Sequence, residues 1–434
     1  MAETGTVADL SEAGEGIVRG GRAAFVPGAL PGETIRFARA RAHRQYDEAR
    51  LEQVIEPSPE RVEPRCAHFA VCGGCALQHL DATAQLQRKQ QQLRESLERI
   101  GRVAPARWLA PLTSPSFGYR RRARLGVRYV ARKGRALVGF RERSSHLIAD
   151  IARCEVLSPP LDALIDPLAR LVSALSIRER LPQIECAVAD NAVALVLRVL
   201  EPPSAQDLGR LEVFEAEHGV RLYLQSAGPD SVRALKPPDP ALHYTLPDPP
   251  LTLGFEPTDL IQVNAAANRA LVAAARELLE LGPDSQLADL YCGLGNFTLA
   301  LAHRAQQVTG VEGEMALIRR AQANAARNGI ANAHFHCADL AAAEHGAAPW
   351  ATAHYTHVLL DPPRAGARAL LPWIASRAPR RLLYVSCHPG SLARDLGELV
   401  HDHGFELLAA GVVDMFPNTA HVESVALLAP QVGS

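Results

Sequence analysis

A cysteine that follows a short apolar run is the residue of this chain most suited to covalent chemistry. Residues 382–385 are apolar or aromatic, and they lead into Ser386, Cys387, His388 and Pro389. The run predicts a buried strand that stops at a proline, and the loop after a strand of an α/β sheet is a common position for reactive side chains. A thiolate at Cys387 could attack a carbon electrophile, whereas the structural alternative is a small core residue.

Acidic residues accompany the other strands that the C-terminal region predicts. Short apolar runs alternate there with helical patterns, as in a doubly wound parallel sheet. The acids at or near the ends of these runs are Asp289, Glu312, Asp339 and Asp361. Parallel strands share their carboxyl edge, so we expect these acids and Cys387 on the edge where α/β proteins bind ligands.

The glycine-rich turn at 293–298 points to the type of cofactor. It ends in a threonine where a third glycine would complete the dinucleotide fingerprint. Glu312 stands 23 residues after Asp289 and could hold two ribose hydroxyls, as acids also do in NAD proteins. The missing glycine and the Asp-Pro-Pro-Arg sequence at 361–364 favour S-adenosylmethionine over NAD. The arginine of that sequence replaces the aromatic residue usual in methylases of exocyclic amines, which argues against amine methylation.

A group of closely spaced cysteines predicts a metal site. Cys66, Cys72 and Cys75 form a C-x5-C-x2-C pattern, with two glycines between the last two cysteines. Thiolates at such spacing bind zinc or an iron–sulfur cluster, and the spacing does not decide between them. Three ligands need a fourth, and Cys154 is the nearest other cysteine.

Two regions have features of nucleic-acid binding. Residues 1–57 predict several short strands with glycine-rich turns, typical of a small β-barrel that binds oligonucleotides. Residues 119–143 contain ten arginines and lysines against the single acid Glu142, a concentration that could neutralise phosphates. The structural alternative is a solvated surface combined with a general preference of the chain for arginine over lysine.

Length and composition set limits on the class of protein. A chain of 434 residues predicts two or three domains, and its net charge of −1 does not by itself indicate nucleic acid. It contains no run of about 18 apolar residues and no secretory signal at its N-terminus. We therefore expect a cytoplasmic protein without membrane contact, in which disulfides are rare.

Several motifs together give the chain a specific resemblance. They lie at 261–264, 289–296, 361–364, 386–389 and 421–424, in addition to the cysteine pattern. With them the chain resembles the RNA 5-methyluridine methyltransferases, and within this family the bacterial enzymes that act on C5 of uracil in 23S rRNA. The resemblance covers nearly the whole chain, and residues 1–57 are similar to a TRAM domain.

The resemblance implies a role for each matching residue. Cys387 falls on the family's nucleophile and Glu423 on its general base. The residues that fall on contacts to S-adenosylmethionine are Gln262, Tyr291, Asn296, Glu312, Asp339 and Asp361. The residues that fall on the ligands of a [4Fe-4S] cluster are Cys66, Cys72, Cys75 and Cys154. Leu260 departs from the aromatic residue expected at its position, so a stacking role there is not carried over.

The expected architecture is α/β with three domains. A TRAM- or OB-like barrel spans 1–57, a central α+β domain with the iron–sulfur cluster spans 58–255, and a Rossmann-like methyltransferase domain spans 256–434. The expected partner is 23S rRNA, with no protein partner implied and a monomeric state. Alternatives are a tRNA T-loop or other rRNA uridine as target, a non-catalytic RNA-binding assembly factor, and an NAD-dependent oxidoreductase.

Overall fold

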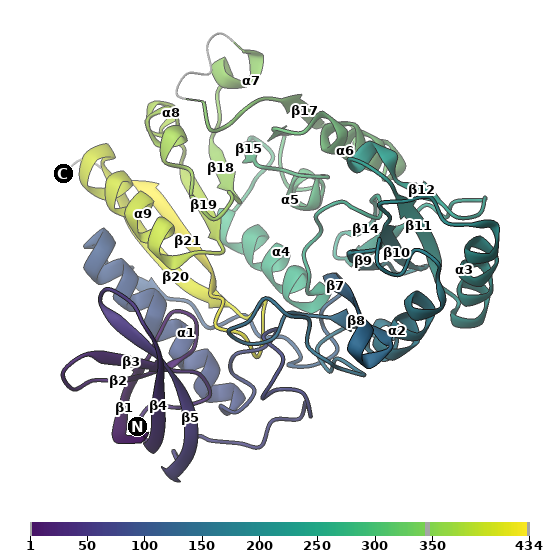
Figure 1. Cartoon of the computed structure of the whole chain (residues 1–434). Helices are drawn as coiled ribbons and strands as arrows, with labels where there is room; N and C mark the ends of the chain where they lie inside the picture. The colour runs from purple at the N-terminus through teal and green to yellow at the C-terminus, as the bar shows by residue number, and fades with distance from the viewer. Residues whose placement is uncertain (1, 343–347, 432–434) are drawn as a thin grey trace.

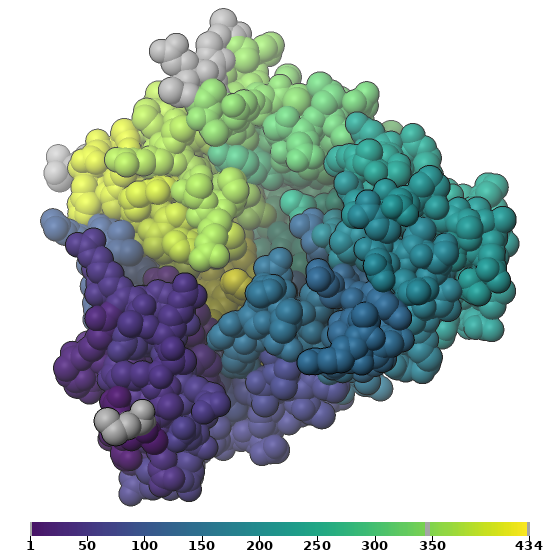
Figure 2. Space-filling model, viewed as in Figure 1, coloured from purple at the N-terminus to yellow at the C-terminus, as the bar shows by residue number. Residues whose placement is uncertain are grey.

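A computed structural model of the protein describes residues 2–342 and 348–431. The described chain builds a closed five-stranded barrel, a six-stranded sheet, a two-stranded hairpin and an eight-stranded sheet (Figure 1). On the face in Figure 2 the surface is hollowed between the yellow-green C-terminal part and the blue to teal central part. Within the described ranges, no helix is both long and apolar enough to cross a membrane.

The N-terminal barrel forms as the short alternating strands predict. Its strands follow the order β1-β2-β3-β5-β4 around the barrel. They are β1 (Ala2–Leu10), β2 (Gly16–Val18), β3 (Ala23–Val26), β4 (Thr34–Ala42) and β5 (Tyr46–Glu56). Alternate side chains point inward, so Val7, Val26, Ile35 and Phe37 are almost completely buried in a core of their own.

The central sheet has the strand order β12-β11-β10-β9-β7-β8. Its strands are β7 (Arg122–Val130), β8 (Arg135–Gly139), β9 (Gln183–Val188), β10 (Val193–Arg198), β11 (Arg221–Gln225) and β12 (Arg233–Ala234). Helices α2 (Ile165–Ala174) and α3 (Ala205–His218) pack against it. The six prolines from Pro237 to Pro250 predict a connector to the last domain. The structure instead forms a hairpin there, with β13 (His243–Pro247) and β14 (Pro250–Gly254).

The C-terminal sheet has the order β17-β16-β15-β18-β19-β21-β20-β6, with the first five strands parallel. Its strands are β6 (Arg107–Trp108), β15 (Gln286–Leu290), β16 (Gln307–Glu312), β17 (Ala333–Cys337), β18 (His357–Leu360), β19 (Arg381–Ser386), β20 (Phe405–Val413) and β21 (Glu423–Pro430). Its helices are α4 (Ala265–Leu279), α5 (Asn296–Ala302), α6 (Met315–Arg327), α7 (Pro349–Thr352), α8 (Leu371–Arg377) and α9 (Pro389–His403).

Helices cover both faces of this sheet. Alternate residues of each strand enter two separate cores, one with α4 and α5, the other with α8 and α9. Leu383 lies in the first core, while Leu382 and Tyr384 lie in the second, and all three are completely buried. The sheet is therefore rigid on both sides of the strand that leads to Cys387.

A helix from outside the C-terminal region completes the second core. α1 (Ala82–Ser96) packs against α9 and β20, and β6 adds a last strand beside β20. The sequence predicts one helix to Ile100 with a buried stripe, but a π-helical turn, Leu97–Gly101, ends it. Leu97 is buried, whereas Ile100 is 54% exposed, because the wider turn rotates it away from the core.

Candidate active site

Cys387 directly follows β19, at the carboxyl edge of the sheet. Its thiol is partly exposed. His388 begins the next helix, and its Nδ1 accepts the Ser391 backbone N–H at 3.1 Å, so this histidine caps α9. Burial, Glu423 and Asp361 raise the pKa of Cys387. Cys387 is thus a partly exposed residue held between a buried strand and a capped helix.

Glu423 is the first residue of β21, the antiparallel neighbour of β19. Ser386 pairs with Ser424, so the next position of the register sets Cys387 opposite Glu423. Glu423 is 5% exposed. Burial, and next the charge of Asp361, raise the pKa of Glu423 to about 8. Such a carboxyl is suited to exchanging a proton near neutral pH.

Asp361 directly follows β18, and its charge acts on Cys387. Its Oδ2 accepts a hydrogen bond from Gln262 Nε2 at 3.3 Å. Burial raises the pKa of Asp361 to about 7. Gln262 belongs to the segment before α4, which begins where the Asn264 side chain accepts the Ala267 N–H. The structure therefore brings together Gln262, Asp361, Cys387 and Glu423.

The glycine-rich turn forms a second part of the same edge. Gly293 and Gly295 have φ of 56° and 96°, and Tyr291 also has a positive φ of 66°. Glu312, at the end of β16, accepts the Gly293 N–H on Oε2 at 3.1 Å and the Gly313 N–H on Oε1 at 2.7 Å. These bonds hold the Glu312 carboxylate beside the glycine-rich turn. An acid at the end of the second parallel strand is expected to lie there.

The remaining expected cofactor residues lie around this turn in different environments. Tyr291 is half-buried, and burial, followed by the charge of Asp339, raises the pKa of Tyr291 to about 12. Asp339 is exposed after β17, and its Oδ1 accepts the Ala341 N–H. Asn296 Oδ1 accepts hydrogen bonds from Tyr244 Oη and Asn268 Nδ2, each at 2.9 Å. The Oδ1 atom of Asn296 is therefore already occupied by hydrogen bonds from other residues of the protein.

Asp289 lies near the end of β15, and the family resemblance assigns it no role of its own. It is completely buried, its Oδ2 accepts the Thr298 hydroxyl at 2.5 Å, and its Oδ1 finds no partner among the described residues. Burial raises the pKa of Asp289 to about 7. Asp289, Asp361 and Glu423 together form a region in which an ionised carboxylate is unfavourable unless a cation lies nearby. This property fits a positively charged ligand such as a sulfonium.

Arg121 is buried beside the site and does not face solvent as a phosphate-binding residue would. Its Nε donates to the Gln262 carbonyl at 2.9 Å, and its guanidinium lies 4.5 Å from the ring centroid of Tyr244. Arg122 is buried too and pairs with Glu185 at 3.1 Å. The phosphate-binding prediction is therefore wrong for these two arginines. No local sequence signal indicates this, because their partners Gln262 and Glu185 lie far away in sequence.

The four cysteines predicted to bind a metal converge in the central region. Cys66, Cys72, Cys75 and Cys154 are free and line one cavity with Phe140 and other residues. Burial raises the pKa of Cys75 to about 11 and that of Cys154 to about 12, so as free thiols they are neutral. In the described part of the chain, no group of three or more His, Cys, Asp or Glu is arranged to hold a metal ion.

The cavity nevertheless has features of a metal-cluster site. A Cβ on Gly74 would lie 3.3 Å from the Phe140 ring and 3.5 Å from Cys72 Sγ, and one on Gly73 would lie 3.1 Å from the Arg141 carbonyl. The Gly74 N–H also donates to Cys72 Sγ at 3.4 Å, as backbone groups do to metal-bound sulfur. Four cysteines that line one cavity match the number of ligands that a [4Fe-4S] cluster needs.

Comparison with known proteins agrees with this geometry. The family model described as tRNA (Uracil-5-)-methyltransferase matches residues 251–431. The 23S rRNA (uracil(1939)-C(5))-methyltransferase RlmD of Alkalilimnicola ehrlichii is 50% identical over 97% of this chain and 95% of its own. RlmD of Methylococcus capsulatus is 49% identical over 95% of this chain and 94% of its own.

A solved structure resembles the chain over nearly its whole length. It is the Pyrococcus abyssi tRNA (uracil-54, C5)-methyltransferase in complex with S-adenosyl-L-homocysteine. It has a TM-score of 0.78 and 25% identity, and covers 98% of this chain and 99% of its own. On the identities and coverage of its relatives, the chain belongs to the family of 23S rRNA (uracil-C5)-methyltransferases of the RlmD type.

Proposed function

We propose that the protein transfers a methyl group from S-adenosylmethionine to C5 of a uridine in 23S rRNA. The observation that carries the proposal is the antiparallel register that sets Cys387 opposite Glu423 at the edge where Asp361 ends its strand. The relatives named RlmD act on uracil 1939, so the equivalent nucleotide is the proposed target. A uridine in the T-loop of tRNA is the second candidate, because a tRNA uracil methyltransferase shares the fold.

Cys387 is the proposed nucleophile. C5 of uracil is a poor nucleophile, and a bond between the Cys387 sulfur and C6 turns the ring into an enolate whose C5 can accept a methyl group. The strand β19 and the capped helix α9 hold the sulfur in place for this attack. Arg364 is the nearby cation that lowers the pKa of Cys387 against the larger effect of burial.

Glu423 is the proposed base for the last step. The C5–H bond breaks, its proton goes to the Glu423 carboxylate, and its electron pair forms the C5–C6 double bond. In the same step the C6–S bond breaks and its electron pair returns to Cys387 as thiolate. A buried carboxylate close to the nucleophile suits this task because its raised pKa gives it basicity near neutral pH.

The residues around the glycine-rich turn are proposed to hold the methyl donor. Glu312 would accept hydrogen bonds from two ribose hydroxyls, since both of its oxygens are already oriented by backbone N–H groups. The other residues proposed to contact the donor are Gln262, Tyr291, Asn296, Asp339 and Asp361. When bound, S-adenosylmethionine supplies an electrophilic methyl group on a sulfonium. That positive charge would be favoured beside the buried carboxyl of Asp289 and the partly buried carboxyl of Asp361.

The cysteine cavity is proposed to hold a [4Fe-4S] cluster through Cys66, Cys72, Cys75 and Cys154. Methylation requires no electron transfer, so the group would act as a structural cross-link between the loop 66–75 and the segment around Cys154. When bound, its iron would be coordinated by the four sulfurs and would keep them as thiolates, including the two buried ones, Cys75 and Cys154. No step of the methyl transfer depends on it chemically.

RNA is proposed to contact the barrel and the central sheet. The N-terminal barrel resembles a TRAM domain and exposes Arg36, Arg41 and Arg44. A surface groove beside the cysteine cavity is lined by exposed cations of the arginine-rich segment, namely Arg124, Arg128, Arg132, Lys133 and Arg141. These side chains could neutralise phosphates, while the target uracil leaves its stack to reach Cys387.

The test of the proposed function is mass mapping of 5-methyluridine in rRNA and tRNA from a strain that lacks this gene. The account predicts the loss of one 5-methyluridine from 23S rRNA and its return when the gene is restored. Loss from tRNA alone would transfer the proposal to the second candidate. An unchanged pattern in both RNAs would reject a uracil methyltransferase.

A further inference from the structure

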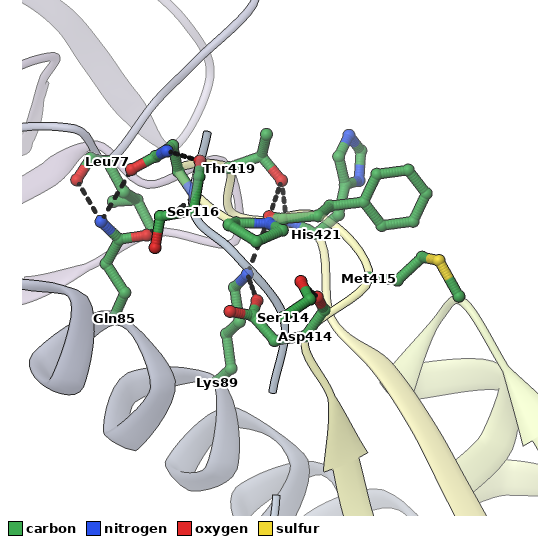
Figure 3. A network of polar contacts seen from close by, with 12 residues as sticks. Leu77, Gln85, Lys89, Ser114, Ser116, Asp414, Met415, Thr419 and His421 are labelled. Atoms are coloured by element: carbon green, nitrogen blue, oxygen red, sulfur yellow. Dashed lines mark hydrogen bonds and ion pairs between the residues drawn. The ribbon is translucent and has the colours of Figure 1, made fainter. Parts of the chain in front are cut away.

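The loop 414–422 joins β20 to β21 and ends at Glu423. It contains no helix or strand, so its own backbone bonds do little to fix it. Yet Asn418 and Thr419 are 3% and 5% exposed, and Val422 is 2% exposed. The loop must therefore be held by partners from outside, and the close view in Figure 3 shows several of them around it.

Asn418 is the most heavily bonded residue of this loop. Its N–H donates to Gln85 Oε1 at 2.9 Å, and its Oδ1 accepts from Gln85 Nε2 at 3.2 Å. Its Nδ2 donates to the Ser116 carbonyl at 2.6 Å. Its carbonyl accepts the N–H groups of Ala76 and Leu77, each at 3.0 Å. With φ of 66°, it holds a left-handed conformation that these bonds fix.

Lys89 holds the start of the same loop. Its Nζ forms an ion pair with Asp414 Oδ1 at 2.8 Å and donates to the Phe416 carbonyl at 2.9 Å. Lys89 is 2% exposed. Burial lowers the pKa of Lys89, while Asp414 opposes this effect. A buried ammonium is costly without such partners, so this pair couples the helix firmly to the loop.

Gln85 and Lys89 lie four residues apart, on one buried face of α1. The inward side of a helix normally carries apolar residues, and polar groups there need specific partners. Lys89 finds both of its partners in the loop, and Gln85 joins the loop to the carbonyls of Leu77 and Leu80 (Figure 3). Leu77 in turn follows Cys75 by two residues, so the cysteine-rich loop and the base-carrying loop are attached to each other.

We propose that Gln85, Lys89 and the backbone of Ala76–Leu77 form a clamp on the loop 414–422 that positions Glu423 for proton removal. The inference rests on the proposed function. Gln85 and Lys89 are positioning residues, because they touch the loop and not the reacting atoms. In the described part of the chain, the side-chain hydrogen bonds of Gln85 and Lys89 go to the loop 414–422 and to the carbonyls of Leu77 and Leu80, and none goes to Cys387. The clamp therefore acts mainly on the base and much less on the attack of the thiol.

Because the clamp acts on Glu423, its loss should slow one particular step of the reaction. Attack at C6 and methyl transfer precede proton removal, so a loosened Glu423 delays only the breaking of the C6–S bond. Enzyme that is covalently joined to methylated RNA then accumulates. A variant that simply unfolds or binds RNA poorly would lose turnover without accumulating this adduct.

The experiment compares Gln85→Met and Lys89→Met with Gln91→Met. The Gln91 side chain is exposed on α1 and, among the residues that the structure describes, bonds only Glu95. Each protein is incubated with S-adenosylmethionine and RNA, and the adduct is separated on a denaturing gel. We expect turnover about tenfold or more lower in the clamp variants, since small displacements of catalytic groups have such effects. The adduct with ordinary RNA should rise severalfold in them and stay unchanged in Gln91→Met.

RNA with 5-fluorouridine at the target provides the second arm, because it has no C5 proton to remove. The clamp variants should form this adduct at about the wild-type rate. Reduced turnover without adduct on ordinary RNA, or unchanged turnover, would overturn the clamp. Failure of the wild type itself to form the fluorouridine adduct would reject the proposed function instead.

Asn418→Gly gives an independent variant in case a buried methionine prevents folding. Glycine accepts the positive φ and keeps the backbone bonds, while the side-chain bonds to Gln85 and Ser116 are lost. The same accumulation of adduct is expected in a weaker form. Its absence in a folded Asn418→Gly protein with lowered turnover would also count against the clamp.

Discussion

Cys387 and Glu423 occupy facing positions beside the Ser386–Ser424 pair of two antiparallel strands. Cys387 directly follows β19, and Glu423 is the first residue of β21. The position of one relative to the other is therefore fixed by the register of β19 and β21. Their charges interact as well, since Glu423 raises the pKa of Cys387. A thiolate and a neighbouring carboxylate disfavour each other's charged form, so the ionisation of the nucleophile and that of the base are coupled.

Replacement of Cys387 by alanine should abolish methylation and leave binding of the methyl donor intact. The sulfur is the only proposed covalent partner of the uracil, so a loss of at least about a thousandfold in turnover is expected. Incorporation of labelled methyl groups into RNA and a binding titration with S-adenosylmethionine measure the two properties. Residual turnover near the wild-type rate would show that another group activates the ring.

The breakdown of the covalent adduct should become slower as the pH falls below 8. The pKa of Glu423 is raised to about 8, so below that pH a growing share of the carboxyl is protonated and cannot accept the C5 proton. The rate should drop by about tenfold per pH unit well below the pKa and level off above it. Rapid-quench measurement of adduct decay tests this, and a flat profile between pH 6 and about 8 would contradict it.

Glu312→Gln should weaken binding of the methyl donor. The change removes a charged acceptor for two ribose hydroxyls, and hydrogen bonds to a charged group contribute about 1.5–3 kcal/mol, or roughly 10- to 150-fold in Kd. Glu314→Gln is the matched control, because Glu314 is exposed and makes no side-chain cap bond. Isothermal titration measures both, and equal affinity in the two variants would remove Glu312 from the site.

Loss of the proposed iron–sulfur cluster should destabilise the central region without preventing binding of S-adenosylmethionine. Cys66→Ser should reduce the iron content of protein purified without oxygen and lower its Tm by about 5 °C or more. Cys337→Ser, an exposed cysteine outside the cavity, should keep the iron. Wild-type protein without iron under the same conditions would exclude the cluster.

The sequence predicts the working edge of the sheet well because this edge follows from a local rule. Each parallel strand ends at the same side, so Glu312, Asp361 and Cys387 could be assigned to one edge from strand order alone. The structure confirms this edge. The individual roles of these side chains stay predictions until the variants are measured.

What the sequence does not predict depends on partners that are distant in the chain. Arg121 is 141 residues from the Gln262 carbonyl that it binds, and Gln85 is 333 residues from Asn418. The local sequence around Arg121 shows only a run of basic residues, and that around Gln85 shows only a polar position in a helix. The docking of α1 on the C-terminal sheet, and hence the clamp, becomes visible only in three dimensions.

Glu423→Gln incubated with target RNA and S-adenosylmethionine gives the most direct test. The account predicts a stable protein–RNA adduct, and mass spectrometry after protease and nuclease digestion should find a methylated uridine nucleotide on the peptide that contains Cys387. Its mass should include one added methyl group, because methyl transfer precedes the blocked step. Full turnover, no adduct, or a nucleotide attached to another residue would contradict the pairing of Cys387 with Glu423.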